Sequence, residues 1–125
     1  MVEKRFTNKV VIITGASSGI GLACAERFKE EGAKVCTIQR SHSKLFDSYE
    51  FDLTREQDCL KSIEAIFNKY GCIDVLINNA GFGLYGHFHN TDWEREASML
   101  NLHIISTTHL TKLILINQRQ TLLFQ

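Results

Sequence analysis

The sequence predicts an α/β protein in which helices cover both faces of a parallel sheet. Short apolar segments alternate with longer segments of helical periodicity, as in consecutive βαβ units. Residues 73–77 form an apolar run interrupted only by Asp74, which is typical of a strand covered on both faces. Right-handed crossovers between such units place the strands in the order 3-2-1-4.

The first half of the chain contains three of the expected strands. Gly32 is placed to end the first helix as a left-handed cap. In order, we expect a strand at 9–13, a helix at 19–31, a strand at 34–38, a polar loop at 41–48 and a short strand near 49–51.

Both helices of the second half begin with a capping box, a hydroxyl residue followed three positions later by glutamine or glutamate. Thr54 leads the first box and Thr91 the second. The helix from Thr54 turns Leu60, Ile63 and Phe67 to one face. In order, we expect a helix at 54–70, a strand at 73–77, a glycine-rich loop at 78–90 and a long helix from 91 to about 116.

Length and composition describe one globular domain. The chain has 125 residues, 44% of them hydrophobic, with 14 basic and 14 acidic side chains. This charge balance gives no electrostatic reason to expect nucleic acid or an anionic membrane as a partner. No apolar stretch approaches the ~20 residues of a membrane span, and residues 1–5 leave no room for a signal peptide before the first strand.

The cysteines indicate a reducing compartment. They lie far apart and form no C-x-x-C pair, which favours reduced, mostly buried thiols and a cytoplasmic location. A zinc site or a disulfide is the alternative. The four are Cys24, Cys36, Cys59 and Cys72.

The strongest functional signal is the turn Thr14-Gly15-Ala16-Ser17-Ser18-Gly19-Ile20-Gly21, between the first strand and the first helix. Glycines allow close backbone approach, and a helix N-terminus offers free N–H groups, so this turn suits a dinucleotide pyrophosphate. It lacks the Gly-Lys-Ser/Thr ending of a triphosphate-binding loop. Its spacing also differs from plain G-x-G-x-x-G, and Ser18 stands where Gly-x-x-Gly-x-x-Gly would need glycine.

Three motifs together resemble the short-chain dehydrogenase/reductase family. They are Thr14-Gly15-x-x-x-Gly19-x-Gly21, Asp52 after the third strand, and Asn78-Asn79-Ala80-Gly81 after the fourth. The resemblance covers residues 6 to about 116, and it implies an incomplete dinucleotide-binding domain at residues 1–116 followed by a tail at 117–125 that diverges from the family pattern. It implies a partial Rossmann-like doubly wound sheet and hydride transfer between a nicotinamide cofactor and a small carbonyl or alcohol substrate.

The resemblance also implies which residues contact the cofactor. Asp52 would accept a hydrogen bond from the adenine amino group, although aspartate is also common in turns before helices. Asn78 and Asn79 would in addition tie neighbouring strands together. The implied contacts are Gly15, Ser17, Ser18, Gly19, Ile20 and Gly21 at the pyrophosphate and adjacent ribose, Asp52 and Leu53 at adenine, and Asn79, Ala80 and Gly81 at the nicotinamide-side ribose.

The end of the second strand favours NADP over NAD. An NAD enzyme needs a carboxylate there for the ribose 2′-hydroxyl, whereas NADP needs a cation for the 2′-phosphate. This chain has Gln39-Arg40 and no acidic residue before Asp47. A guanidinium suits bidentate phosphate contact. The alternative is an ordinary solvated arginine.

The chain departs from the family in its catalytic residues. The family uses a tyrosine with a lysine four positions later on one helix face, and an upstream serine. Here the residues four places after Tyr49, Tyr70 and Tyr85 are Leu53, Asp74 and His89. We therefore name no catalytic residue and expect a truncated, catalytically incomplete member. The alternatives are a non-catalytic dinucleotide-binding or interaction module, or a product without function.

Two histidine features receive no functional assignment. His103 stands where the family places an asparagine in the long helix, and it is either a helix-kink residue or simply packed. The pair His87-x-His89 lacks a third ligand at useful spacing, so we predict no metal site.

Apolar residues after the fourth strand have two interpretations each. The loop residues line an apolar substrate pocket or pack toward solvent; they are Phe82, Leu84, Tyr85 and Phe88. The helix residues are most simply buried, or they form a homo-oligomer interface along residues 92–116; they are Trp93, Met99, Leu100 and Ile104. The fourth strand would lie at an open sheet edge, which predicts a marginally stable or aggregation-prone chain unless that edge is covered.

Overall fold

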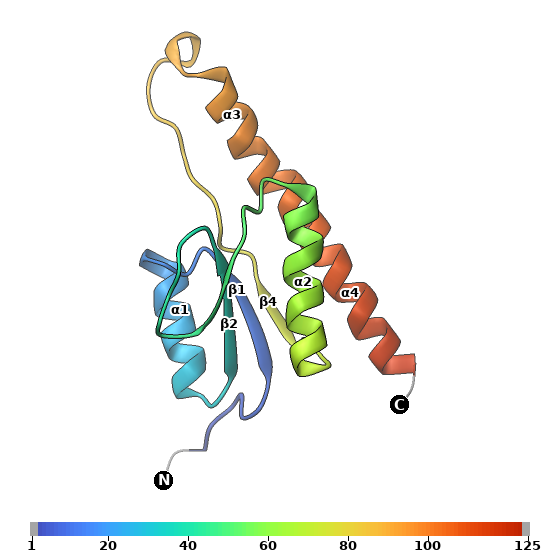
Figure 1. Cartoon of the computed structure of the whole chain (residues 1–125). Helices are drawn as coiled ribbons and strands as arrows, with labels where there is room; N and C mark the ends of the chain where they lie inside the picture. The colour runs from blue at the N-terminus through green and yellow to red at the C-terminus, as the bar shows by residue number, and fades with distance from the viewer. Residues whose placement is uncertain (1–2, 124–125) are drawn as a thin grey trace.

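The computed structural model describes the backbone of residues 3–123 and the side chains of residues 3–118. Its centre is a four-stranded parallel sheet in the order β3-β2-β1-β4, which confirms the predicted order (Figure 1). Val11 on the central strand pairs with Val35 on one side and Val75 on the other. The strands are β1 (Val10–Thr14), β2 (Lys34–Gln39), β3 (Asp47–Glu50) and β4 (Val75–Ile77).

Helices cover both faces of the sheet, as the doubly wound class requires (Figure 1). α1 (Gly19–Glu30) covers one face, whereas α2 (Glu56–Tyr70) and α4 (Thr107–Leu123) cover the other. Gly32 follows α1 with a φ of +89°, in agreement with the expected left-handed cap.

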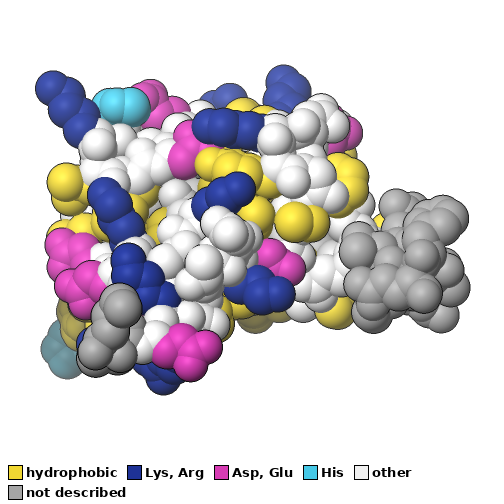
Figure 2. Space-filling view, turned by 90° about the horizontal axis from the view of Figure 1, so that it is seen from below, with side chains coloured by type: hydrophobic (Ala, Val, Ile, Leu, Met, Phe, Trp, Pro, Cys, Tyr) yellow, Lys and Arg dark blue, Asp and Glu magenta, His cyan; other side chains and the backbone are white. Residues whose placement is uncertain are grey.

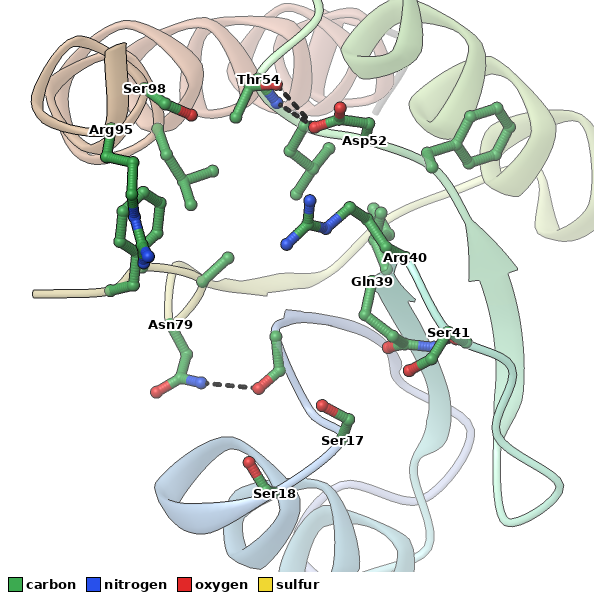
Figure 3. A pocket seen from close by; sticks show the side chains of 18 of the residues that line it. Ser17, Ser18, Gln39, Arg40, Ser41, Asp52, Thr54, Asn79, Arg95 and Ser98 are labelled. Atoms are coloured by element: carbon green, nitrogen blue, oxygen red, sulfur yellow. Dashed lines mark hydrogen bonds between the residues drawn. The ribbon is translucent and has the colours of Figure 1, made fainter. Parts of the chain in front are cut away.

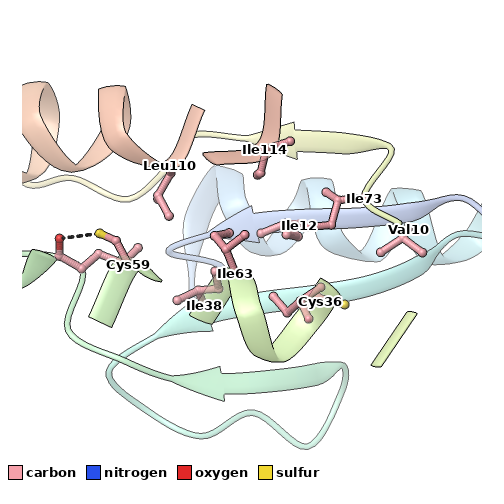
Figure 4. Packing of buried hydrophobic residues seen from close by; sticks show 11 residues of the cluster. Val10, Ile12, Cys36, Ile38, Cys59, Ile63, Ile73, Leu110 and Ile114 are labelled. Atoms are coloured by element: carbon pink, nitrogen blue, oxygen red, sulfur yellow. Dashed lines mark hydrogen bonds between the residues drawn. The ribbon is translucent and has the colours of Figure 1, made fainter. Parts of the chain in front are cut away.

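Alternate side chains of β1 enter two separate cores, because successive residues of a strand point to opposite faces. Val11 and Ile13 pack on the α1 side with Ala25. Val10 and Ile12 enter the larger core, shown in Figure 4. α2 and α4 contribute to that core Cys59, Ile63, Ile66, Leu110 and Ile114.

Asp47 fastens the edge strand β3 to the end of α2. One carboxylate oxygen, Oδ2, accepts hydrogen bonds from Tyr49 Oη and Tyr70 Oη, both at 2.7 Å, and from Lys69 Nζ at 3.0 Å. Burial raises the pKa of Asp47, but these donors outweigh it and hold the pKa below the ordinary value of 3.8. The cluster lies away from the carboxyl ends of the strands.

Neither predicted capping box forms as expected. The N-cap of α2 is Arg55, which makes no side-chain cap bond. The Thr54 hydroxyl, which the capping box would use, donates instead to Asp52 Oδ1 at 2.6 Å. α3 is capped by Asp92, whose Oδ2 accepts from Arg95 N at 3.1 Å. In both cases the N-cap lies one residue after the predicted threonine.

The long C-terminal helix is not regular. It consists of α3 (Trp93–Leu100), the π-helical turn η2 (Asn101–Ser106) and α4. It passes the expected end near 116 and continues to Leu123, so most of the predicted tail is helical. Residues 124 and 125 lie outside the described residues, and the divergence of the tail from the family pattern stays a prediction.

Several apolar residues of this helix are exposed, so the expectation that they are buried is wrong. Trp93 is 68% exposed, Leu100 46% and Ile104 59%, and Met99 is half-buried. By length and mean hydropathy alone, Trp93–Gln118 is long and apolar enough to cross a membrane, contrary to the sequence-based expectation. Core helices of water-soluble proteins meet the same criterion.

Charged side chains of both signs share the surface. On the face shown in Figure 2, lysine and arginine side chains alternate with aspartate, glutamate and apolar ones. None of the described residues on this face build a patch of a single sign. The four thiols are unpaired; Cys36 and Cys59 are buried, and Cys24 and Cys72 are half-buried.

Candidate functional site

A cleft of about 1100 Å³ opens at the carboxyl ends of the strands (Figure 3). The β1–α1 turn, the end of β2, the loop after β3, the loop after β4 and α3 all contribute to its walls. This is where open α/β sheets bind ligands. Of the predicted residues, those lining the cleft are Gly15, Ser17, Ser18, Ile20, Arg40, Asp52, Leu53, Asn79, Ala80 and Gly81.

The two remaining predicted residues, Gly19 and Gly21, do not line the cleft. Gly19 has a φ of +59°, a conformation that favours glycine. Gly21 is buried, and a Cβ added there would overlap the Asn79 amide and the Gly15 carbonyl. These glycines shape the turn rather than its cleft surface.

Gly15 allows the β1 turn to approach the β4 turn closely. Its φ is +68°, and an added Cβ would lie 2.8 Å from Ala80 Cα. α1 begins directly after this turn, and its N-cap, Ser18, makes no side-chain cap bond. N–H groups of the first helical turn are therefore left for a ligand beside the cleft.

Thr14 and Asn79 join the ends of β1 and β4. Thr14 Oγ1 accepts from the backbone N–H groups of Asn79 at 3.0 Å and Ala80 at 2.9 Å. The Asn79 side chain donates to the Gly15 carbonyl at 2.9 Å. The expectation that both asparagines tie strands together holds for Asn79, whereas Asn78 donates to Thr111 Oγ1 on α4.

Asp52 offers an ionised carboxylate at the cleft wall. The Thr54 hydroxyl and backbone N–H both donate to Oδ1, and with the positive charges of Arg40 and Arg55 they lower the pKa of Asp52 against the effect of burial. Next to it, Leu53 is 5% exposed and belongs to the core. The wall formed by the loop after β3 thus has a hydrogen-bond acceptor at Asp52 and an apolar side chain at Leu53.

Arg40 extends its guanidinium from the end of β2 into the cleft, on the side of Asp52 (Figure 3). Among the ion pairs of the described residues, none includes Arg40. Gln39 beneath it is 8% exposed and donates to Ser48 Oγ at 2.6 Å and to the Ser41 carbonyl at 2.9 Å. These hydrogen bonds hold the end of β2 next to Arg40, and the charged guanidinium of Arg40 faces the cleft.

Sequence reasoning missed the wall that α3 and the start of η2 supply. Arg95, Ser98 and Leu102 line the cleft, and Arg95 lies over the ring of Phe82 at 5.9 Å. Their spacing of three and four residues places them on one helix face, a signal that could have identified them. Of the loop aromatics, Phe82 lines the cleft, whereas Tyr85 and Phe88 are 97% and 84% exposed.

His103 contacts the loop after β4. Its Nε2 lies 3.1 Å from the backbone N of Phe82 and 3.0 Å from the carbonyl oxygen of the same residue. The rings of His87 and His89 stack, with centroids 5.8 Å apart. Within residues 3–118, no group of three or more His, Cys, Asp or Glu side chains is arranged to hold a metal ion.

The amino-acid sequence of this chain is similar to those of known oxidoreductases. A sequence model described as short chain dehydrogenase matches residues 9–120. The 3-oxoacyl-[acyl-carrier-protein] reductase FabG of Thermotoga maritima is 31% identical, over 88% of this chain and 50% of the relative. The chain thus spans about half the length of this curated relative.

Two solved structures have the same fold. A metagenomic short-chain oxidoreductase in complex with NADP has a TM-score of 0.84 and 25% identity, over 90% of this chain and 57% of that protein. The 3-ketoacyl-(acyl-carrier-protein) reductase of Brucella melitensis complexed with NADH has a TM-score of 0.78 and 28% identity, over 85% and 48%. With the family model matching most of its length, this chain belongs to the short-chain dehydrogenase/reductase family of oxidoreductases.

Proposed function

We propose that this chain binds NADP(H) in the cleft as the cofactor-binding part of an oxidoreductase acting on a small carbonyl or alcohol. The observation that carries the proposal is the convergence on one cleft of the glycine turn, a cation and a carboxylate: Gly15, Arg40 and Asp52. The cofactor supplies the hydride; the protein residues bind and orient it.

Each wall suits a different part of the cofactor. The Gly15 turn and the start of α1 would receive the pyrophosphate, because backbone N–H groups and the helix dipole favour an anion. Asp52 would accept from the adenine amino group, with Leu53 against the ring. Asn79, Ala80 and Gly81 would lie along the nicotinamide-side ribose. The close packing of Gly15 on Ala80 supports this fit, since a side chain there would close the approach.

Arg40 supports NADP over NAD. Its guanidinium is the cation at the end of β2 that the 2′-phosphate needs. The next acidic residue, Asp47, accepts hydrogen bonds in the cluster at the far end of β3 and is engaged there. The relatives include both an NADH complex and an NADP complex, so the preference rests on Arg40.

Isothermal titration calorimetry with NADPH and NADH tests this proposal. We expect tighter binding of NADPH than of NADH, and a loss of NADPH affinity of about 10- to 150-fold for Arg40→Ala, as for one hydrogen bond to a charged group of about 1.5–3 kcal/mol. NADH binding should change little. Arg27→Ala is the matched control, because Arg27 is exposed on α1 and pairs with Glu31. Tighter binding of NADH by the unaltered chain would refute the NADP assignment.

The tyrosine–lysine pair that supplies the proton in the resembled family does not occur among these 125 residues. No tyrosine is followed by a lysine at the fourth position, so we expect the chain to bind NADPH without oxidising it when a carbonyl compound is added. The exposed apolar face of α3 and α4 supports self-association through residues 92–116. Unpaired thiols support a cytoplasmic location.

A further inference from the structure

The π-helical turn η2 lies between two loops that wall the cleft, and it contacts both. On one side is the loop after β3, which carries Asp52 and Leu53. On the other is the loop after β4, which carries Gly81 and Phe82. π-helical turns are rare and occur often at functional sites.

Ser106 fixes the loop after β3. The residue is 3% exposed, and its hydroxyl donates to the Leu53 carbonyl. The Cys59 thiol reaches the same carbonyl oxygen at 3.4 Å, drawn as a dashed line in Figure 4. Asn101 Oδ1, at the start of η2, lies 3.2 Å from the Ser106 oxygen. Leu53 is thus held from α2 and from η2 together.

His103 fixes the loop after β4. Its Nε2 is within hydrogen-bond distance of both the N–H and the carbonyl of Phe82. Its ring also covers Gly81 so closely that a Cβ on the glycine would overlap it. The histidine thereby limits how far the Gly81–Phe82 backbone can move.

The π turn explains how one segment reaches both loops. In a regular α-helix, residues three apart lie on the same face. The wider π turn spreads the side chains of His103 and Ser106 apart, so that they meet different loops. A regular helix through 101–106 would lose one of the two contacts.

We propose that η2 sets the width of the cofactor cleft, with Ser106 and His103 as positioning residues for its adenine-side and nicotinamide-side loops. The inference rests on the proposed cofactor function. It assigns each residue to one end of the dinucleotide, and that division makes it testable with a cofactor fragment.

The test measures binding of NADPH and of adenosine 2′,5′-bisphosphate, which carries only the adenine end. Ser106→Ala should weaken both ligands about tenfold. His103→Ala should weaken NADPH by a similar factor and leave the fragment unchanged. His103→Asn should restore NADPH binding, because an amide can donate to the Phe82 carbonyl and accept from its N–H. Thr108→Ala and His109→Ala are matched controls on α4.

Amide hydrogen exchange of the ligand-free variants adds a readout that does not need the cofactor. His103→Ala should speed exchange at Phe82 more than at Thr54, which follows Leu53, and Ser106→Ala should do the reverse. Ser106→Cys, with a weaker donor, provides a second variant with an intermediate effect. Equal losses for both ligands in both variants would overturn this inference alone. Failure of the unaltered chain to bind NADPH would overturn the proposed function and the cofactor role of η2 with it.

Discussion

Two buried threonines in neighbouring strands should respond in opposite ways to the same substitution. Thr14 on β1 is 1% exposed and Thr37 on β2 is fully buried. The Thr14 hydroxyl accepts from the N–H groups of Asn79 and Ala80 and lies 3.5 Å from the Ile77 carbonyl. Among the residues that the structure describes, the Thr37 hydroxyl has no hydrogen-bond partner.

Valine preserves the shape of threonine and removes the hydroxyl. In Thr14→Val, two backbone N–H groups lose their hydrogen-bond acceptor, and each fully buried group of this kind costs about 1–3 kcal/mol. Because both N–H groups are only partly buried, we expect the free energy of unfolding to fall by about 2–4 kcal/mol. In Thr37→Val, the unpaired hydroxyl is removed from the core, so we expect a gain of about 1 kcal/mol. The first loss is large against a typical net stability of about 5–15 kcal/mol.

Urea unfolding followed by circular dichroism measures both changes. With a slope of about 1–3 kcal/mol per molar urea, Thr14→Val should lower the midpoint by about 1–2 M. Amide exchange should rise at Asn79 and Ala80 in Thr14→Val alone. Thr14→Ser, which keeps the hydroxyl, should retain most of the stability. Equal destabilisation by both valine substitutions would refute the hydrogen-bond assignment.

Three further predictions concern acid, the β1 turn and the long helix. The pKa of Asp47 is lowered in the folded protein, so its contribution to stability is present above pH 3.8 and is lost as the pH falls through the folded pKa. Asp47→Asn should therefore flatten the acid part of a curve of unfolding free energy against pH. An unchanged curve would count against the Asp47 cluster. In urea unfolding, Gly15→Ala should lower the free energy of unfolding more than Gly71→Ala does. A positive φ costs a non-glycine residue about 1–2 kcal/mol at either position, but only at Gly15 would the added Cβ also meet Ala80. Equal losses would contradict the close approach of Gly15 to Ala80. Ile105 is 61% exposed on the long helix, so Ile105→Glu should leave the fold intact. In analytical ultracentrifugation it should shift the sedimentation of the chain toward the monomer. An unaltered chain that already sediments as a monomer would rule out self-association.

The sheet and most of the cleft could be predicted from sequence because they depend on local signals. The apolar runs specify β1 and β2, and right-handed crossovers then leave one order for the strands. The glycine turn, Asp52 and Asn79 each follow a strand, so the parallel sheet brings them to one edge. These signals need no knowledge of the contacts between distant segments.

The parts that could not be predicted depend on such contacts. Thr54 has the right sequence for a cap, but Asp52 takes its hydroxyl, and the helix begins one residue later than predicted. An apolar helix face is the same in sequence whether it is covered or exposed, so Trp93 and Ile104 were misplaced in the core. The family resemblance marks His103 as a helix-kink or a packed position, but the extent of the π turn depends on Ser106 and His103 reaching two loops at once.

No single continuous stretch of chain makes all the walls of the cleft. Gly15 and Ser98, which both line it, lie far apart in the sequence, on the first strand–helix turn and on α3. The recognition surface therefore exists only in molecules whose sheet and long helix have assembled. Any substitution that lowers this competent fraction, however distant, weakens apparent affinity in the same proportion. Loss of binding in a remote variant is then first a measure of how many molecules are folded.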